Sequence, residues 1–349
     1  MEDLILIFRQ ILLQIFHKFK QERTISAPFH LLRGKRSGQT IQDVGIFQLH
    51  MYFGILPKLS RKTYDEEISK LIEEQYMTVS DEGYYILTAK AKEMNQTVDL
   101  PFNGWQYRGN EHLFFARLSL VIQSLSHKAY NQMSFLPIQK DPQVQEWVRK
   151  FLISHHYQER DLQQQLYEEI IVSLEQAPIE QHAKVIVMKR LTGYKIAGYT
   201  WQQLSIYENK SEMDIQFIYI ACLHAWLNGI TDKESQFPLL AAIAEQVRVA
   251  MPLSGSAYQT AQLFQQGYSI EQISQYRKLK RSTIEDHIVE IAMNNPRFDI
   301  RSFITEEEIH QVVNAVDDYN TRKLKILHEV MPNLSYFQIR LVLARGETV

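Results

Sequence analysis

The sequence has very little cysteine, with one residue, Cys222, among 349. Secreted domains held together by disulfides are therefore excluded, and we expect a protein of the reducing cytoplasm. Zinc sites need Cys and His at short spacings that the sequence lacks, and the adjacent His155 and His156 would point in different directions on a helix. We expect Cys222 to be an uncharged core thiol, and we predict no metal site and no cofactor.

The sequence also has no excess of positive or negative charge. The chain has 38 basic and 40 acidic side chains, which gives a formal net charge of -2. No global field draws such a protein onto nucleic acid or an anionic membrane. Any site for DNA must therefore be a local basic patch.

No segment has the features of a signal peptide or a membrane span. Residues 4–19 are rich in Leu, Ile and Phe, but they follow two acidic residues and are interrupted by Arg9, Gln10 and Gln14. The apolar residues recur at helical spacing. This spacing predicts an amphipathic helix buried against its own domain, with docking onto a partner protein as the alternative.

Catalytic motifs are equally scarce. The phosphate-binding pattern Gly-x-x-x-x-Gly-Lys-Ser/Thr is absent, so we expect no ATP hydrolysis. His224 lies on an apolar helix and is expected to be a core histidine, while Glu306, Glu307 and Glu308 form a charged first turn capped by Thr305. We expect no enzyme, and a nuclease built from scattered carboxylates is the remaining catalytic alternative.

Helical periodicity dominates the rest of the chain and predicts a mainly α fold. We divide it into a winged-helix-like domain with the amphipathic first helix (1–100), a helical bundle (110–250) and a helix-turn-helix domain (255–345). Polar residues, proline and glycine between Met94 and Gly109 indicate a linker or an irregular crossing segment.

The first domain shows three helices followed by a hairpin, which is the order of a winged helix. The expected elements are 29–33, 40–52, 61–74, 77–79 and 84–87, with Gly83 in the turn. The basic loop Gly34–Gly38 offers amides and cations to a phosphate, so Arg33, Lys35 and Arg36 form a second candidate DNA contact. Acidic residues on the third helix argue against it (Glu66, Glu67, Glu73 and Glu74), and a winged helix that contacts only protein is the alternative.

The pattern that points most clearly to DNA begins at Ser256. Helix 257–265 would end at Gly267, Ser269 would cap the second helix, and Ser282 would cap a recognition helix holding Ile284, Ile288 and Ile291 inside. We expect Arg281, Thr283, Glu285, His287 and Glu290 to face outward. The candidate DNA-binding residues at this turn and helix are Arg277, Lys278, Lys280, Arg281, Ser282, Thr283 and His287.

A similar half-motif occurs in the middle bundle, from Leu191 to Leu204. Its recognition helix would begin with Ser211, Glu212, Met213 and Asp214, which do not attract phosphates. Packing is therefore the better explanation of this motif.

Several motifs resemble domains of RecQ-type helicases. Leu32, Arg33 and Gly34, with Tyr85–Thr88, resemble their winged helix, and the run from Gly267 through His287 to Arg340 resembles the helicase helix-turn-helix domain. As a whole, the sequence is similar to the YpbB-like family, whose gene often neighbours a RecQ-type helicase. The resemblance implies a role in DNA repair or recombination beside such a helicase, but the helicase motor is missing.

These observations leave three hypotheses. The first is a nucleoid-associated accessory protein that binds duplex or forked DNA. We expect it to recognise DNA shape or the DNA backbone, because the basic turn has few side chains that could form paired hydrogen bonds with a base. The second is a scaffold for a helicase without DNA binding, and the third is a transcription regulator with a ligand pocket in the middle bundle.

Overall fold

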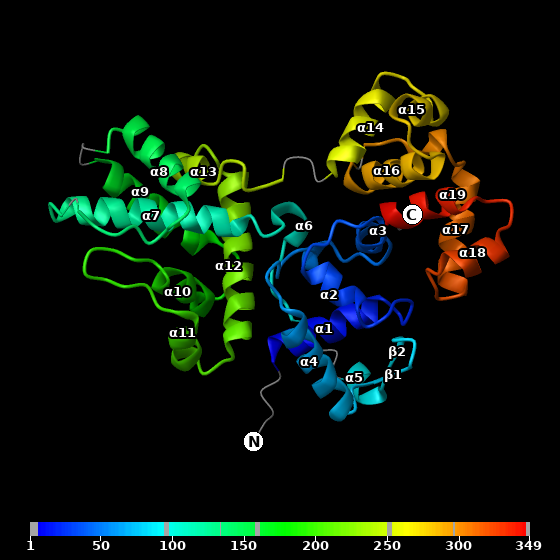
Figure 1. Cartoon of the computed structure of the whole chain (residues 1–349), viewed down its shortest axis with the longest axis horizontal. Helices are drawn as coiled ribbons and strands as arrows, with labels where there is room; N and C mark the ends of the chain where they lie inside the picture. The colour runs from blue at the N-terminus through cyan, green and yellow to red at the C-terminus, as the bar shows by residue number, and fades with distance from the viewer. Residues whose placement is uncertain are drawn as a thin grey trace. The chain divides into compact units, whose positions relative to one another are not determined.

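The computed structural model describes residues 6–93, 98–132, 134–157, 161–249, 253–295 and 297–346. Contacts divide the chain into two compact units: unit 1 holds residues 1–11 and 97–250, and unit 2 holds residues 12–96 and 251–349. The fold is mainly helical with a small antiparallel hairpin, which confirms the predicted class (Figure 1). None of the helices among the described residues is long and apolar enough to cross a membrane.

Helix α1 (Ile7–Lys18) is buried by the chain itself, but not only against the predicted domain 1–100, because its residues up to Ile11 belong to unit 1. In unit 1 the ring of Phe8 lies 5.7 Å from that of Phe217. In unit 2 the Tyr85 hydroxyl donates a 2.5 Å hydrogen bond to the carbonyl of Phe16. The buried apolar residues of this segment are Phe8, Ile11, Leu12, Leu13, Ile15, Phe16 and Phe19.

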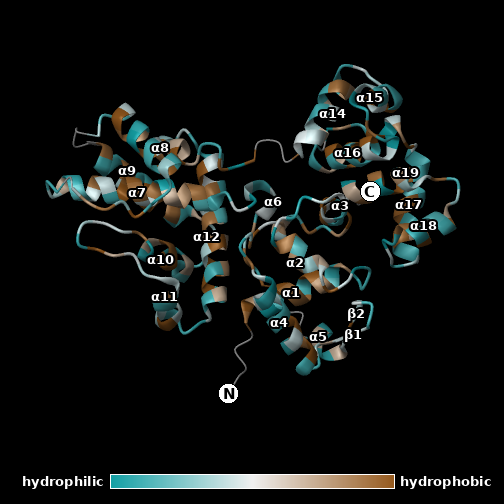
Figure 2. Cartoon of the chain, in the orientation of Figure 1, coloured by the Kyte–Doolittle hydropathy of each residue, from teal (hydrophilic) through white to brown (hydrophobic). Residues whose placement is uncertain are grey.

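Unit 1 is a helical bundle around α12 (Glu212–Asp232), a 21-residue helix that is buried along most of its length. Hydrophobic residues recur along α12 and α7 (Figure 2). Trp226, at the centre, donates its indole N–H to Ser173 Oγ at 2.7 Å. The other helices of this unit are α6 (Gly104–Tyr107), α7 (Glu111–Ala129), α8 (Pro142–Ser154), α9 (Asp161–Gln176), α10 (Gln181–Lys189), α11 (Trp201–Glu208) and α13 (Pro238–Ile243).

His224 is a core histidine, as predicted. Its Nδ1 accepts a 2.9 Å hydrogen bond from the Asn103 amide, and its Nε2 lies 3.3 Å from the Glu111 carboxylate. The Tyr107 ring stacks on the imidazole at 4.9 Å. Since Tyr107 and Trp105 are buried, residues 98–109 form a packed, irregular segment and not a linker, while residues 94–97 lie outside the described residues.

The N-terminal part of unit 2 has the predicted winged-helix order. In the hairpin Met77 pairs with Leu87 and Val79 with Tyr85, and Gly83 turns the chain at φ +82°. The predicted helix 40–52 is in fact two shorter elements, α3 (Gly38–Ile46) and η1 (His50–Tyr52). The elements are α2 (Ala27–Leu32), α3 (Gly38–Ile46), η1 (His50–Tyr52), α4 (Arg61–Glu73), β1 (Met77–Val79), β2 (Tyr85–Leu87) and α5 (Ala89–Glu93).

The C-terminal helices belong to the same unit, and α16 packs against α3 as well as α14 and α19. Glu22 joins the two parts, because its carboxylate accepts hydrogen bonds from Thr321 Oγ1 at 2.7 Å and from the Arg322 amide at 2.8 Å. The helices are α14 (Gly255–Gln265), α15 (Ile270–Arg277), α16 (Arg281–Asn294), η2 (Ile300–Ser302), α17 (Glu306–Asp318), α18 (Leu324–Val330) and α19 (Tyr336–Arg345).

Candidate nucleic-acid interface

Helices α14, α15 and α16 form the predicted helix-turn-helix. Ser269 caps α15 in a reciprocal box with Gln272, and Gly267 takes φ +89°, so both predictions are confirmed. In the turn, Lys278 is left-handed at φ +53° and Ser274 Oγ donates to the Leu279 carbonyl at 2.6 Å. The next N-cap is Lys280 and not the predicted Ser282, which lies in the first turn of α16.

Lys278, Lys280 and Ser282 are exposed at the start of α16, and Thr283 is half-buried beside them. Arg281 is also exposed, but its guanidinium pairs with Glu271 of α15 and, at 2.9 Å, with Glu285. The unneutralised basic charge therefore comes mainly from the two lysines. They lie beside the positive end of the helix dipole, which attracts phosphate oxygens.

Arg277, predicted to contact DNA, is instead engaged within the domain. Its guanidinium donates to the Ser256 carbonyl at 2.6 Å, to Thr260 Oγ1 at 2.5 Å and to Gln259 Oε1 at 3.0 Å. These bonds tie α15 to α14. Arg277 thus positions the turn, whereas Lys278 and Lys280 remain exposed.

The predicted outward orientation of His287 and Glu290 is wrong, since each is only 8% exposed. His287 Nδ1 lies 2.9 Å from Thr260 Oγ1, and burial, together with the nearby charge of Arg277, lowers the pKa of His287. Glu290 accepts hydrogen bonds from Ser254 at the start of α14. Because α16 packs on α14, α3 and α19, its exposed residues, Arg281 and Ser282, lie in its first turn.

The structure adds two tyrosines that sequence reasoning did not assign to the site. Tyr276 is 72% exposed, two residues before Lys278, and its ring lies 6.4 Å from that of Tyr268. Their exposure follows from how α15 packs on its neighbours. Helical periodicity alone gave no signal for it.

A second basic patch surrounds the end of α2, where Arg33, Lys35 and Arg36 are exposed as expected. Arg61 of α4 joins them, because Arg33 and Arg61 lie 5.4 and 5.3 Å from the same Phe29 ring. Burial, and then the charges of Lys35, Arg61 and Arg33, lower the pKa of His30. The acidic residues of α4 still oppose this patch, because only Glu67 is buried and Asp65 pairs with Arg61 at 2.8 Å.

Comparisons with known proteins agree with this geometry. A family model described as a helix-turn-helix domain matches residues 256–343. The chain is 33% identical over 346 residues to Protein YpbB of Bacillus subtilis (strain 168), covering 97% of both chains. The chain belongs to the YpbB family. No solved structure matches it. The helix-turn-helix domain suggests DNA binding, whereas the name YpbB gives no function.

This YpbB-family chain contains a second turn of the same kind, between α11 and α12 of unit 1. Thr200 caps α11 in a box with Gln203, Asn209 is left-handed at φ +51°, and Ser205 Oγ donates to the Lys210 carbonyl at 2.6 Å. These features match those of the turn between α15 and α16. The packing interpretation is confirmed, because Asp214 in the first turn of α12 is buried and accepts from the Phe8 amide at 3.2 Å.

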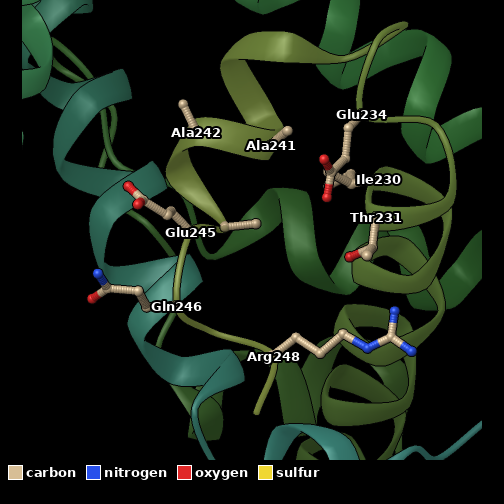
Figure 3. Close-up of a pocket in the computed structure, with 9 residues that line it drawn as sticks. Ile230, Thr231, Glu234, Ala241, Ala242, Glu245, Gln246 and Arg248 are labelled. Carbon is tan, nitrogen blue, oxygen red and sulfur yellow. The ribbon is translucent and has the colours of Figure 1, made fainter. Parts of the chain in front are cut away.

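The same YpbB-family unit has a surface pocket of about 430 Å³ beside α12 and α13. Figure 3 shows the side chain of Arg248 across the opening from Thr231, with Glu234 beyond and Glu245 to the side. Ligand pockets of this size are usually lined by apolar groups with a few polar ones, and this lining combines Ile230 and three alanines with polar and charged side chains.

Proposed function

We propose that this protein is a non-enzymatic accessory protein that binds DNA in repair or recombination. The observation that carries the proposal is the pair of exposed lysines, Lys278 and Lys280, at the positive end of the 14-residue helix α16. A helix-turn-helix meets the major groove with the N-terminal residues of its second helix. The free turn of α16 is the matching part of this structure.

The contacts at this turn favour the DNA backbone over base edges. Arginine reads guanine with two parallel N–H bonds, but Arg281 is already held by Glu271 and Glu285. Lysines act as point charges toward phosphates. We therefore expect DNA binding with little sequence preference, and strong preference for one duplex sequence at physiological salt would contradict this.

Fluorescence anisotropy with labelled duplex, forked and single-stranded DNA tests the proposal. Lys278→Glu/Lys280→Glu should weaken duplex binding by tenfold or more. The control Lys323→Glu/Lys325→Glu makes the same charge change at two exposed lysines at the start of α18 and should bind like the native protein. Equal duplex affinity in both variants would overturn the assignment.

We further propose that a RecQ-type helicase is the partner. The support is the resemblance of two segments of unit 2 to domains of such helicases. Co-purification of the two proteins should survive nuclease treatment, and a complex that disappears with the DNA would contradict a direct contact. The alternative of a protein scaffold without DNA binding was favoured by the apolar first helix. That argument no longer holds, because the apolar face of α1 is buried within the chain.

A transcription regulator is the second candidate, favoured by the pocket that contains Arg248. It predicts a small ligand that changes DNA affinity and a preferred operator sequence. Arg248→Ala should then abolish the ligand effect while leaving ligand-free binding unchanged.

A further inference from the structure

Unit 1 carries a run of sequence without acidic residues between Glu180 and Glu208. No acidic residue occurs in these 27 positions (181–207), although the chain has 40 acidic residues among 349. The run contains Lys184, Lys189, Arg190 and Lys195, along with three tyrosines and a tryptophan. Basic and aromatic side chains are thus interleaved in a protein whose net charge is close to zero.

The structure gathers part of this run into a first cluster on α10 and α11. Lys189 Nζ lies 4.7 Å from the centre of the Tyr199 ring and 4.2 Å from that of Tyr207. The two rings meet edge to face at 6.3 Å. Tyr207 is 57% exposed, so much of its surface is open to a ligand.

A second cluster lies at the other end of the loop between α10 and α11. Tyr194 stacks on Tyr130 at 4.6 Å with an angle of 27°, and Lys195 Nζ lies 5.3 Å from the Tyr194 ring. Tyr130 is 63% exposed. The aromatic–lysine surface, as we call these two clusters, consists of Tyr130, Lys189, Tyr194, Lys195, Tyr199 and Tyr207.

The loop between α10 and α11, which carries Tyr194, Lys195 and Tyr199, is held in place. The Tyr194 amide donates to Ser126 Oγ at 2.9 Å, and the Gly198 amide donates to Thr192 Oγ1 at 3.1 Å. A Cβ atom on Gly198 would lie 2.3 Å from the Arg190 carbonyl, so this close approach requires glycine. The backbone of the loop is therefore fixed before any ligand arrives, which lowers the entropic cost of binding.

We infer that the aromatic–lysine surface binds single-stranded nucleic acid. Exposed aromatic rings stack on bases of any sequence, and neighbouring cations contact the backbone. Tyr194 and Tyr199 are five residues apart, so their Cα atoms are separated by at most about 18 Å, a distance that a few nucleotides span. Duplex binding through α12 is disfavoured, because its first turn holds Glu212 and the buried Asp214.

Anisotropy of the full chain with labelled oligothymidine and oligouridine of about 20 nucleotides tests this inference, and the two probes distinguish DNA from RNA. Lys195→Glu/Tyr207→Ala should weaken single-strand binding by roughly tenfold or more. The control Lys140→Glu/Tyr167→Ala changes one exposed lysine and an equally exposed tyrosine of the same unit and should bind normally. Circular dichroism should show that both variants are folded.

The inference is independent of the proposed duplex site. Lys278→Glu/Lys280→Glu should keep single-strand binding while losing duplex binding. The inference is overturned if the native chain binds neither probe, if both double variants of unit 1 bind equally, or if the unit 2 variant loses the single strand.

Discussion

Arg277 shows how a basic residue beside the turn proposed to bind DNA can stabilise the fold. It makes hydrogen bonds to Ser256, Thr260 and Gln259 of α14. We expect Arg277→Ala to lower the free energy of unfolding by about 1–2 kcal/mol, because these bonds join two helices. Lys278→Ala should leave the melting temperature unchanged and weaken DNA binding. Urea denaturation of both variants checks this, and equal stability losses would contradict it.

His50 provides a pH-dependent test. Burial, and then the charge of Lys18, lower its pKa from 6.5 to about 4. As pH falls below 6.5, the unfolded chain takes up a proton that the folded chain does not, so folding stability is lost between pH 6.5 and 4. The loss at this site should reach up to about 3 kcal/mol, and His50→Gln should remove it from the pH profile. Identical pH profiles for the native protein and the variant would contradict the buried neutral imidazole.

At the residue scale, the sequence predicted the two lysines that the structure exposes at the candidate site, but not the orientation of their neighbours. The spacing of Ile284 and Ile288 placed the helix-turn-helix core correctly. His287 and Glu290 were misplaced because α16 is covered on several sides by helices distant in sequence. Arg61 was not predicted as part of the second patch. It lies there because its guanidinium and that of Arg33 both contact the Phe29 ring.

At the scale of elements, the structure agrees with one predicted helix cap and disagrees with another. Ser269 accepts a hydrogen bond from the Gln272 amide and begins α15, whereas Ser282 lies inside α16. Ser269→Ala should lower the free energy of unfolding by about 1 kcal/mol, while Ser282→Ala should change it little. Chemical denaturation of the two variants gives the comparison, and the reverse order would restore Ser282 as the cap.

Local signals predicted most elements well. The hairpin at Gly83, α4 and α15 lie close to their expected positions, because turns and caps depend on nearby residues. The predicted helix 40–52 does not continue beyond Phe47, and a short 3₁₀ turn follows instead. That break depends on packing within unit 2, which periodicity does not encode.

At the scale of the whole molecule, the first and last parts of the chain share unit 2. Glu22 receives hydrogen bonds from Thr321 and Arg322, and Arg322 donates to the Ile46 carbonyl. Glu22→Ala should therefore lower the free energy of unfolding by about 2–3 kcal/mol and destabilise the distant helix-turn-helix. Hydrogen exchange should show faster exchange in both α3 and α16, and a change confined to residues near Glu22 would contradict this coupling.

The salt dependence of duplex binding tests the central claim most directly. Each neutralised phosphate contributes about -0.9 to the slope of log K against log salt, so contacts from Lys278, Lys280 and the start of α16 predict a slope of roughly -2 to -3. Lys278→Glu/Lys280→Glu should bring the slope close to zero. An unchanged slope and affinity in that variant would show that DNA, if bound, is held elsewhere, and would contradict the helix-turn-helix as the DNA site.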